Sequence, residues 1–330
     1  MDNLIRKTVK TSRGFLYTYY TSQSSNGKPT AFLLHGWPDH APLWEDLATN
    51  HIIPKGYGVI IPDCLGFGDS SKPTRPEDFH SVGLTGDLRD ILDAENVDQV
   101  VVSGHDSGAG LAHRFYAYHP ERCSGLFIFN VAASPQPQRP FSLEEWASMS
   151  MESMGYFPAW YWYLFCDPLL GPSLLNQHAE SLFTALHAEP KAWMTTLCAE
   201  DGLKAWLKQD KKGPVQQYAT DEMRLRFIKR MTRDGFESPL CYYRSKRDGR
   251  FDEQDSRLPA DRYKIKVPYL FVAGTQDVVC RPEAIETVEK LGLVPQLTVR
   301  QVDAGHWCML AKPDEVGKLV VEWLDDTYRC

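Results

Sequence analysis

The sequence predicts an α/β protein with a mostly parallel central sheet, flanked by helices and interrupted by an inserted helical lid. Short apolar runs alternate with helix-like segments through the first third of the 330 residues, as is typical of parallel strands covered on both faces. The middle of the chain has almost no strand pattern, and the alternation resumes afterwards. We therefore expect a core formed by residues 1–133 and 259–330, with the lid over residues 134–258.

The first part of the core shows five strand patterns and three helix patterns. Most of the strand patterns are short apolar runs that end at a glycine or a polar residue, as buried parallel strands do. Strands are predicted over residues 14–21, 31–34, 58–62, 100–103 and 126–129, and helices over residues 43–50, 83–96 and 108–119.

The lid differs from the core in composition. It opens with a proline-rich stretch over residues 135–140 and contains five of the nine Trp residues. Helix-like segments dominate it, and one strand is predicted over residues 240–243. So many large aromatic side chains predict both a separate small core for the lid and the wall of a large apolar pocket.

The second part of the core contains the remaining strands. They are predicted over residues 267–273 and 297–302. A closing helix is predicted over residues 313–328, because Val316, Val320 and Trp323 recur at helical spacing.

Composition excludes several classes of protein. Lys and Arg number 36 against 43 Asp and Glu, so the net charge of −7 offers no positive surface for nucleic acid or anionic lipid. No apolar run reaches 18 residues, so we expect no membrane span, and we expect no secretory signal. The eight cysteines form no CxxC pair, which predicts free thiols and a cytoplasmic protein. Without a spaced ligand cluster or a GxGxxG motif, we expect neither a metal nor an organic cofactor.

The strongest local motif is GHDSG at residues 104–108, which follows a strand pattern and opens a helix pattern. This is the context of a nucleophile elbow, whose tight bend requires small residues two positions before and after the nucleophile. Gly104 and Gly108 meet that requirement for Asp106. Ser107 has a histidine two positions before it, so we favour Asp106 as the nucleophile. The alternative is a plain turn in which Asp106 caps the helix.

Two other polar residues follow predicted strands near the C-terminus. Asp277 ends the turn GTQD, and His306 lies in the turn AGHW. Each alone is more often structural, but the order Asp106, Asp277, His306 is that of nucleophile, acid and base in α/β-hydrolases. All three follow the carboxyl ends of strands, where open α/β sheets build their sites.

The chain resembles an α/β-hydrolase of the epoxide-hydrolase and haloalkane-dehalogenase branch over nearly its whole length. The motifs that carry this resemblance are HGWP at 35–38, DCLGFGDS at 63–70, GHDSG at 104–108, GTQD at 274–277 and AGHW at 304–307. Some members place the acid after the sixth strand, where this chain has Asn130, which leaves Asp277 as the matching acid. The resemblance implies an oxyanion hole formed by the backbone N–H groups of Trp37 and Ser107. The residues expected to line the substrate pocket are His35, Pro38, Trp162, Tyr242 and Trp307.

Two lid motifs resemble the stretches that carry the tyrosine donors of epoxide hydrolases. They are YWYLFCDP at 161–168 and CYYR at 241–244. The resemblance implies Tyr161 and Tyr243 as donors to the epoxide oxygen, with Tyr163 as the alternative to Tyr161. The other explanation is that these rings only pack the lid. Halide release needs N–H donors, often a Trp after the nucleophile, and Ser107 at that position argues against a dehalogenase.

An aspartate nucleophile narrows the reaction. A carboxylate attacks a saturated carbon and leaves an alkyl ester on the enzyme, which water activated by His306 and Asp277 can hydrolyse. We therefore predict that the protein hydrolyses an epoxide on an apolar small molecule to a vicinal diol. The alternatives are a dehalogenase with the same nucleophile, a biosynthetic enzyme that opens an epoxide on a larger natural product, and a non-catalytic ligand-binding protein. The sequence does not determine the oligomeric state, and a homodimer is one of the possible states.

Overall fold

The computed structural model describes residues 1, 4–25 and 27–329. Its centre is an eight-stranded sheet with the order β1-β2-β4-β3-β5-β6-β7-β8. β2 pairs antiparallel with β1 and with β4, and all other neighbours pair parallel, so the carboxyl ends of the six parallel strands meet at one edge. The strands are β1 (Ile5–Lys10), β2 (Leu16–Ser22), β3 (Thr30–Leu34), β4 (Gly58–Pro62), β5 (Val100–His105), β6 (Cys123–Phe129), β7 (Tyr269–Gly274) and β8 (Leu297–Val302).

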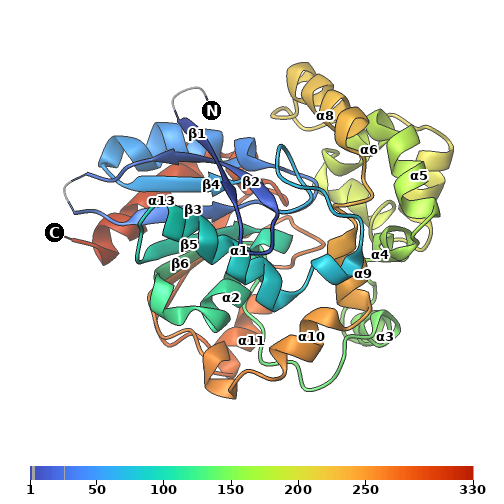
Figure 1. Ribbon diagram of the computed structural model, residues 1–330. Coiled ribbons are helices and arrows are strands. Elements are labelled where there is room, and N and C mark those ends of the chain that lie inside the picture. The colour runs from blue at the N-terminus through green and yellow to red at the C-terminus, as the bar shows by residue number, and fades with distance from the viewer. Residues whose placement is uncertain (2–3, 26, 330) are drawn as a thin grey trace.

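Helices cover both faces of the sheet (Figure 1). α1 (Ser81–Ala94) and α2 (Ser107–Tyr118) lie over one face, and α13 (Pro313–Thr327) and the π-helical η2 (Leu47–Ile52) lie over the other. The strands β3, β4, β5 and β7 are buried along their whole length, which is why they read as continuous apolar runs. The shorter helices of the core are η1 (Ala41–Trp44), η3 (Ile53–Lys55), η4 (Pro76–Asp78), η5 (Pro120–Arg122), η7 (Ala260–Tyr263), α11 (Ala284–Lys290) and α12 (Cys308–Ala311).

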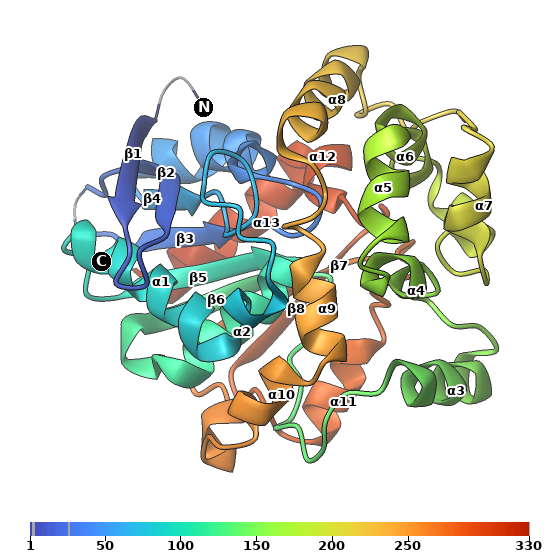
Figure 2. The same cartoon turned by 45° about the vertical axis from the view of Figure 1, so that its right-hand side comes forward.

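Between β6 and β7 the chain forms only helices, and the structure describes every residue of this stretch. Figure 2 shows α4 to α8 grouped on one side of the molecule, beside the carboxyl ends of the parallel strands. α10 instead contacts α1 of the core. The lid boundaries at residues 134 and 258 stay a prediction. The helices are α3 (Leu143–Met154), α4 (Tyr161–Cys166), α5 (Leu170–Gln177), α6 (Ala179–Leu186), η6 (Pro190–Met194), α7 (Gly202–Lys208), α8 (Asp221–Asp234), α9 (Cys241–Arg247) and α10 (Arg250–Asp255).

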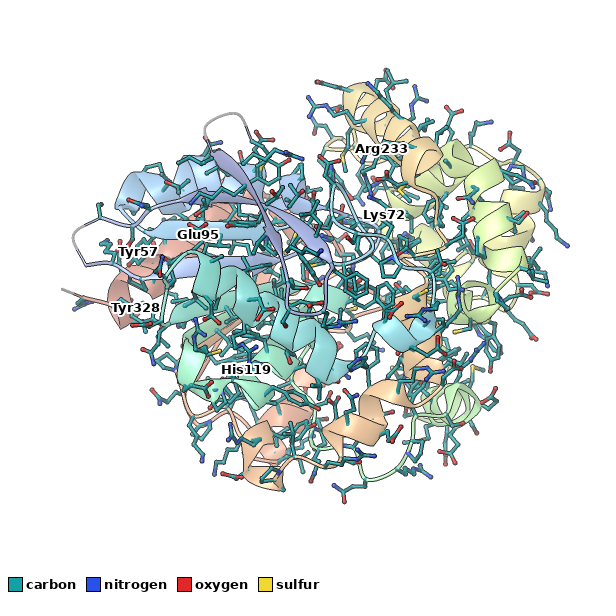
Figure 3. The ribbon with its side chains drawn as sticks, viewed as in Figure 1. Tyr57, Lys72, Glu95, His119, Arg233 and Tyr328 are labelled. Atoms are coloured by element: carbon teal, nitrogen blue, oxygen red, sulfur yellow. The ribbon has the colours of Figure 1, made fainter. Side chains whose placement is uncertain are left out.

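Helix α8 holds the lid against the core. Arg233, labelled in Figure 3, donates to the carbonyl oxygen of Gly68 at 3.1 Å and pairs with Asp69 at 3.0 Å. Three residues earlier on the same helix, Arg230 donates to the carbonyl oxygen of Pro38 at 2.8 Å. These contacts join the lid to the loops that follow β4 and β3.

Most predicted strands and helices are confirmed to within a few residues, but three features differ. β1 escapes prediction because its residues, IRKTVK, are mostly polar and exposed at the edge of the sheet. The strand predicted over 240–243 is wrong, since this stretch enters α9. It lies among lid helices with no strand to pair with, and a short apolar and aromatic run suits either structure. The segment predicted as a helix over 43–50 is not a regular α-helix. It is divided between the 3₁₀-helix η1 and the π-helix η2.

Two further observations concern membrane-spanning helices and the cysteine thiols. Among residues 1, 4–25 and 27–329, no helix is both long and apolar enough to cross a membrane. The cysteines at the described positions are free thiols, and all but Cys280 are buried. The cytoplasmic location and a homodimeric state stay predictions.

Candidate active site

Asp106 lies in a tight turn between β5 and α2. Its backbone has φ 54° and ψ −127°, a conformation that costs a residue with a side chain about 1–3 kcal/mol. Glycines make the turn possible: a Cβ on Gly104 would lie 2.3 Å from the carbonyl oxygen of Gly108, and a Cβ on Gly108 would lie 2.4 Å from that of His35. The turn predicted from GHDSG is therefore present, with the carboxylate of Asp106 at its apex.

The other candidate residues follow the ends of neighbouring strands. Strand pairing aligns Leu34 of β3 with Gly104 of β5, and Gly274 of β7 with Val302 of β8. Since parallel strands end at the same edge, the loops that follow them meet there. This edge carries Trp37, Asp106, Asn130, Asp277 and His306.

The backbone of Trp37 contacts the carboxylate of Asp106. Its N–H donates to Oδ1 of Asp106 at 3.0 Å. Gly36 permits this approach, because a Cβ there would lie 2.6 Å from the Cβ of Asp106. The N–H of Trp37 therefore contacts Oδ1 of Asp106 and does not contact Oδ2. Ser107, the second donor that we expect in the oxyanion hole, begins α2 directly beside Asp106.

His306 lies between two carboxylates. Its Nδ1 is 2.7 Å from Oδ2 of Asp277, and its Nε2 is 3.7 Å from Oδ2 of Asp106. The short contact makes Nδ1 the protonated nitrogen of the neutral ring, so Nε2 carries the lone pair. Because 3.7 Å exceeds a hydrogen bond, Nε2 is free to accept a proton from a third group.

Electrostatics support an acid–base pair of His306 and Asp277. Burial lowers the pKa of His306, but the charges of Asp277 and Asp106 outweigh burial and raise it above 6.5. Burial raises the pKa of Asp277, but the charge and hydrogen bond of His306 outweigh burial and lower it below 3.8. Asp277 is therefore ionised near neutral pH, beside a histidine that titrates above its usual range.

Asn130 joins this pair, a role that the sequence motifs do not predict. Its Nδ2 donates to Oδ2 of Asp277 at 2.7 Å and to the carbonyl oxygen of His306 at 3.0 Å. Its φ of 64° lies in the left-handed region, which Asn tolerates better than most residues. The available signal was its position directly after β6, at the same edge of the sheet as the acid and the base.

Tyr161 and Tyr243 approach Asp106 from the lid. Their ring centroids are 6.3 Å apart, and both residues line the same two cavities as Asp106. Burial and the charge of Asp106 raise the pKa of both phenols well above 10, so both are protonated donors at neutral pH. Tyr163, the alternative to Tyr161, is 40% exposed and lines neither cavity.

Three of the five residues predicted to line the substrate pocket lie at these cavities. Trp162 and Tyr242 line a cavity of about 600 Å³, and Trp307 lines a second one of about 20 Å³. Asp106 borders both. The larger cavity has the size and the mostly apolar lining that small-molecule sites have.

His35 and Pro38 line neither cavity, so their predicted role is corrected. His35 is buried and braces its loop, since Nε2 accepts from the N–H of Cys64 and Nδ1 donates to the carbonyl oxygen of Gly36, both at 2.9 Å. Burial lowers its pKa to about 3, so the ring is neutral. The backbone carbonyl oxygen of Pro38 accepts a hydrogen bond from Arg230. A motif places these residues near the site but does not give the direction of their side chains.

The comparisons with known proteins agree with this geometry. The family model described as the alpha/beta hydrolase fold matches residues 29–313. The chain belongs to the α/β-hydrolase family. This α/β hydrolase is 28% identical over 316 residues to the protein named Epoxide hydrolase srdG of Neurospora crassa. The alignment covers 89% of this chain and 86% of the relative. It is also 28% identical over 320 residues to Epoxide hydrolase A of Mycobacterium tuberculosis. That alignment covers 90% of this chain and 91% of the relative.

A solved structure shows that the fold is shared. The crystal structure of Epoxide Hydrolase A from Mycobacterium thermoresistibile matches this α/β hydrolase with a TM-score of 0.80 and 23% identity. The match covers 98% of this chain and 99% of the other. The sheet, the flanking helices and the helices between β6 and β7 are thus part of one known architecture.

One group of side chains in this α/β hydrolase has the spacing of a metal site. Asp277, Cys280 and His306 offer ligand atoms within 4.8 Å of one another. The carboxylate of Asp277 is already occupied, because Oδ1 accepts two backbone N–H groups at 2.9 Å and Oδ2 accepts from His306 and Asn130. Burial and the neighbouring carboxylates raise the pKa of the Cys280 thiol well above 9, which disfavours the thiolate that binds metals. The donors fit a hydrogen-bonded acid–base pair better than a set of metal ligands.

Proposed function

We propose that this α/β hydrolase opens the epoxide ring of an apolar small molecule and releases a vicinal diol. The observation that carries the proposal is the arrangement around Asp106. Its Oδ2 accepts no hydrogen bond from the residues that the structure describes and lies 3.7 Å from Nε2 of His306, and two protonated phenols border the same cavities. Epoxide opening needs a nucleophile at carbon and a proton donor at oxygen, and these groups supply both. The relatives named as epoxide hydrolases support the same assignment.

The first step transfers the substrate to the enzyme. Oδ2 of Asp106 attacks a ring carbon, and the bond from that carbon to the epoxide oxygen breaks. The oxygen leaves as an alkoxide and takes a proton through the hydroxyls of Tyr161 and Tyr243. The product of this step is a hydroxyalkyl ester of Asp106.

The second step hydrolyses the ester. Water attacks the carbonyl carbon of the Asp106 ester while Nε2 of His306 takes a proton from it, and Asp277 stabilises the imidazolium. The N–H groups of Trp37 and Ser107 stabilise the negative charge that develops on Oδ1. When the ester bond breaks, His306 gives its proton to the leaving oxygen of the diol. The proton left on the carboxyl of Asp106 replaces the one that the tyrosine lost.

The alternatives make different demands on the same site. A dehalogenase would attack with Asp106, but halide is a weak base and needs N–H contacts instead of a phenol proton. In a dehalogenase the indole of a Trp at the position of Ser107 would supply such a contact. The side chain of Ser107 has no N–H group and cannot supply it. A biosynthetic enzyme that acts on a larger epoxide would share the first step, and a binding protein would need neither step.

The experiment is intact-protein mass spectrometry of the His306→Gln variant after incubation with styrene oxide and, separately, with 1-bromohexane. Without the base, the ester should accumulate, so we expect a mass increase equal to the whole epoxide, located on Asp106. The double variant with Asp106→Asn is the matched control and should remain unmodified. A hexyl adduct without bromine would favour the dehalogenase, and a folded variant that forms no adduct with small epoxides would contradict the proposal.

A further inference from the structure

The two cavities at the site differ greatly in size. They share four lining residues, Asp106, Tyr161, Tyr243 and Val279, and no other lining residue among those that the structure describes. The larger cavity has a volume of about 600 Å³ and the smaller about 20 Å³. A water molecule needs roughly 10–15 Å³ of such space, so the smaller cavity holds about one. The nucleophile and both phenols thus lie where a large space meets a water-sized one.

The wall of the small cavity leaves little room for movement. Leu186, Trp193, Leu197 and Trp307 are each at most 5% exposed. The rings of Trp193 and Trp307 meet edge to face at 5.8 Å. Their N–H groups are engaged, since Trp193 donates to the carbonyl oxygens of Ala185 and Leu186 and Trp307 donates to Asp39. Because interiors are close-packed, these side chains cannot retreat without breaking other contacts.

His306 lines the small cavity and not the large one. The base that activates water in the proposed mechanism therefore faces the space that fits one water molecule. A substituent of the substrate placed in this space would displace that water. The small cavity accordingly suits the hydrolytic water rather than a part of the substrate.

The large cavity suits an uncharged apolar group. Its lining includes the rings of Trp146, Trp162, Tyr242 and Phe251. Three cationic side chains also border it, but each is paired with an acid. The pairs are Arg114 with Asp255, Lys246 with Asp252, and Arg281 with Glu283. A charged substituent would find no free partner among these cations.

From this asymmetry we infer that the substrate is a terminal epoxide, with one bulky apolar substituent on one ring carbon and only hydrogen on the other. The inference rests on the proposed function. Asp106 and the tyrosines hold the ring from two sides, and substituents on the two ring carbons point away from each other. One carbon therefore directs its substituent into the large cavity, while the other faces the small cavity. Only hydrogen fits there together with the hydrolytic water.

The test compares two isomers of equal size, 1,2-epoxyoctane and trans-4,5-epoxyoctane, with the wild-type protein. We expect kcat/KM for the terminal epoxide to be about 100-fold higher, because the internal one must place a propyl group in a water-sized space. Equal values for both isomers would overturn the inference and leave the proposed function standing. If neither these nor other small epoxides are hydrolysed, the proposed function fails and the inference fails with it.

Leucine variants test whether the small cavity causes the selectivity. Leu197→Ala enlarges the small cavity, and we expect it to raise the ratio of internal to terminal kcat/KM by about tenfold. Leu111→Ala removes the same atoms from the lining of the large cavity and should not shift the ratio toward the internal epoxide. Leu186→Ala serves the same purpose if Leu197→Ala does not fold. A folded small-cavity variant with an unchanged ratio would overturn the structural explanation.

Discussion

Tyr161, Tyr163 and Tyr243 are chemically identical, but their surroundings differ. Tyr161 and Tyr243 border both cavities at Asp106, and the charge of Asp106 contributes to the raised pKa of each phenol. Tyr163 packs beside Trp160 at a centroid distance of 5.5 Å, away from those cavities. A phenol that donates to the epoxide oxygen must reach the space in front of Asp106, so position alone separates the three tyrosines.

This difference gives a prediction with an internal control. Tyr243→Phe should slow formation of the Asp106 ester by roughly 10²-fold, because the alkoxide loses one of its two proton donors. Tyr161→Phe should have an effect of the same order, and Tyr163→Phe should leave the rate unchanged. Stopped-flow measurement of ester formation with styrene oxide distinguishes them. Equal effects of all three variants would mean that the phenols only pack the lid.

His306 has a raised pKa because of the carboxylates on either side of it. As the base it must be neutral, so hydrolysis of the ester increases as the pH rises through its pKa. Esterification removes the charge of Asp106, and with it part of the effect that raises the pKa of His306. Asp277 then provides the main remaining stabilisation of the imidazolium.

We therefore expect Asp277→Asn to move the acid limb of the pH–rate profile for ester hydrolysis to lower pH. With the charge of Asp277 removed, burial lowers the pKa of His306. The plateau rate should also fall, by roughly 10³–10⁴-fold. An amide that keeps its oxygen on the two backbone N–H groups turns its NH2 group toward Nδ1 of His306, which favours the tautomer without a lone pair on Nε2. Single-turnover rates across pH measure both effects. Asp303→Asn, an exposed carboxylate on the same side of the sheet, is the control, and an acid limb that does not move in Asp277→Asn would contradict the assignment.

The strand–turn–helix element depends on close backbone packing between β5 and α2. Asp106 is held at φ 54° because the chain passes directly from a buried strand into a helix. Gly104 faces the backbone of Gly108 and Ala109, and a Cβ there would lie within 2.6 Å of both. Backbone atoms cannot rotate away as a side chain can, so the element tolerates only glycine at that position.

Gly104→Ala should therefore destabilise the protein by about 3 kcal/mol or more. Gly86→Ala is the matched control, because Gly86 lies within α1 and a Cβ there meets nothing within 4 Å. That change should stabilise the protein by roughly 0.5–1 kcal/mol through the better helix propensity of alanine. Urea unfolding of both variants gives the free energies. A Gly104→Ala variant as stable as the wild type would show that the turn can relax.

At the scale of the whole molecule, the lid completes a site that the core only begins. The core supplies Asp106, Asp277 and His306, and the lid supplies Tyr161 and Tyr243. Arg230 of α8 helps to hold the two together, because it donates to the carbonyl oxygen next to Trp37 and its charge acts on Asp39. Burial raises the pKa of Asp39 to about 6, and the positive charge of Arg230 opposes this shift.

Arg230→Met should lower the free energy of unfolding by about 1.5–3 kcal/mol, since it removes a hydrogen bond from a charged donor. It should also raise the pKa of Asp39 further. Arg226→Met, on the exposed face of the same helix, should change stability by less than about 0.5 kcal/mol. Denaturation followed by tryptophan fluorescence measures both variants. An equal loss in the two would mean that the contact with Pro38 does not stabilise the docked lid.

The parts of this protein that could be predicted are those encoded by neighbouring residues. The elbow around Asp106, the order of Asp106, Asp277 and His306, and the buried strands all follow from short motifs. Each motif requires a particular backbone conformation wherever it occurs, and parallel strands bring their carboxyl ends to one edge in any such sheet. That is why three residues far apart in the chain could be assigned to one site.

Packing between distant segments accounts for the features that local sequence motifs do not predict. It places Tyr161 at the cavities beside Asp106 and Tyr163 away from them, directs His35 into its loop, and brings Asn130 against Asp277. It also makes α9 a helix where a strand is expected. The unequal cavities arise in the same way, from lid and core side chains that meet only in the folded chain. Local residue patterns specify backbone conformation and residue chemistry, whereas the direction of a side chain and the space beside it depend on every segment packed around it.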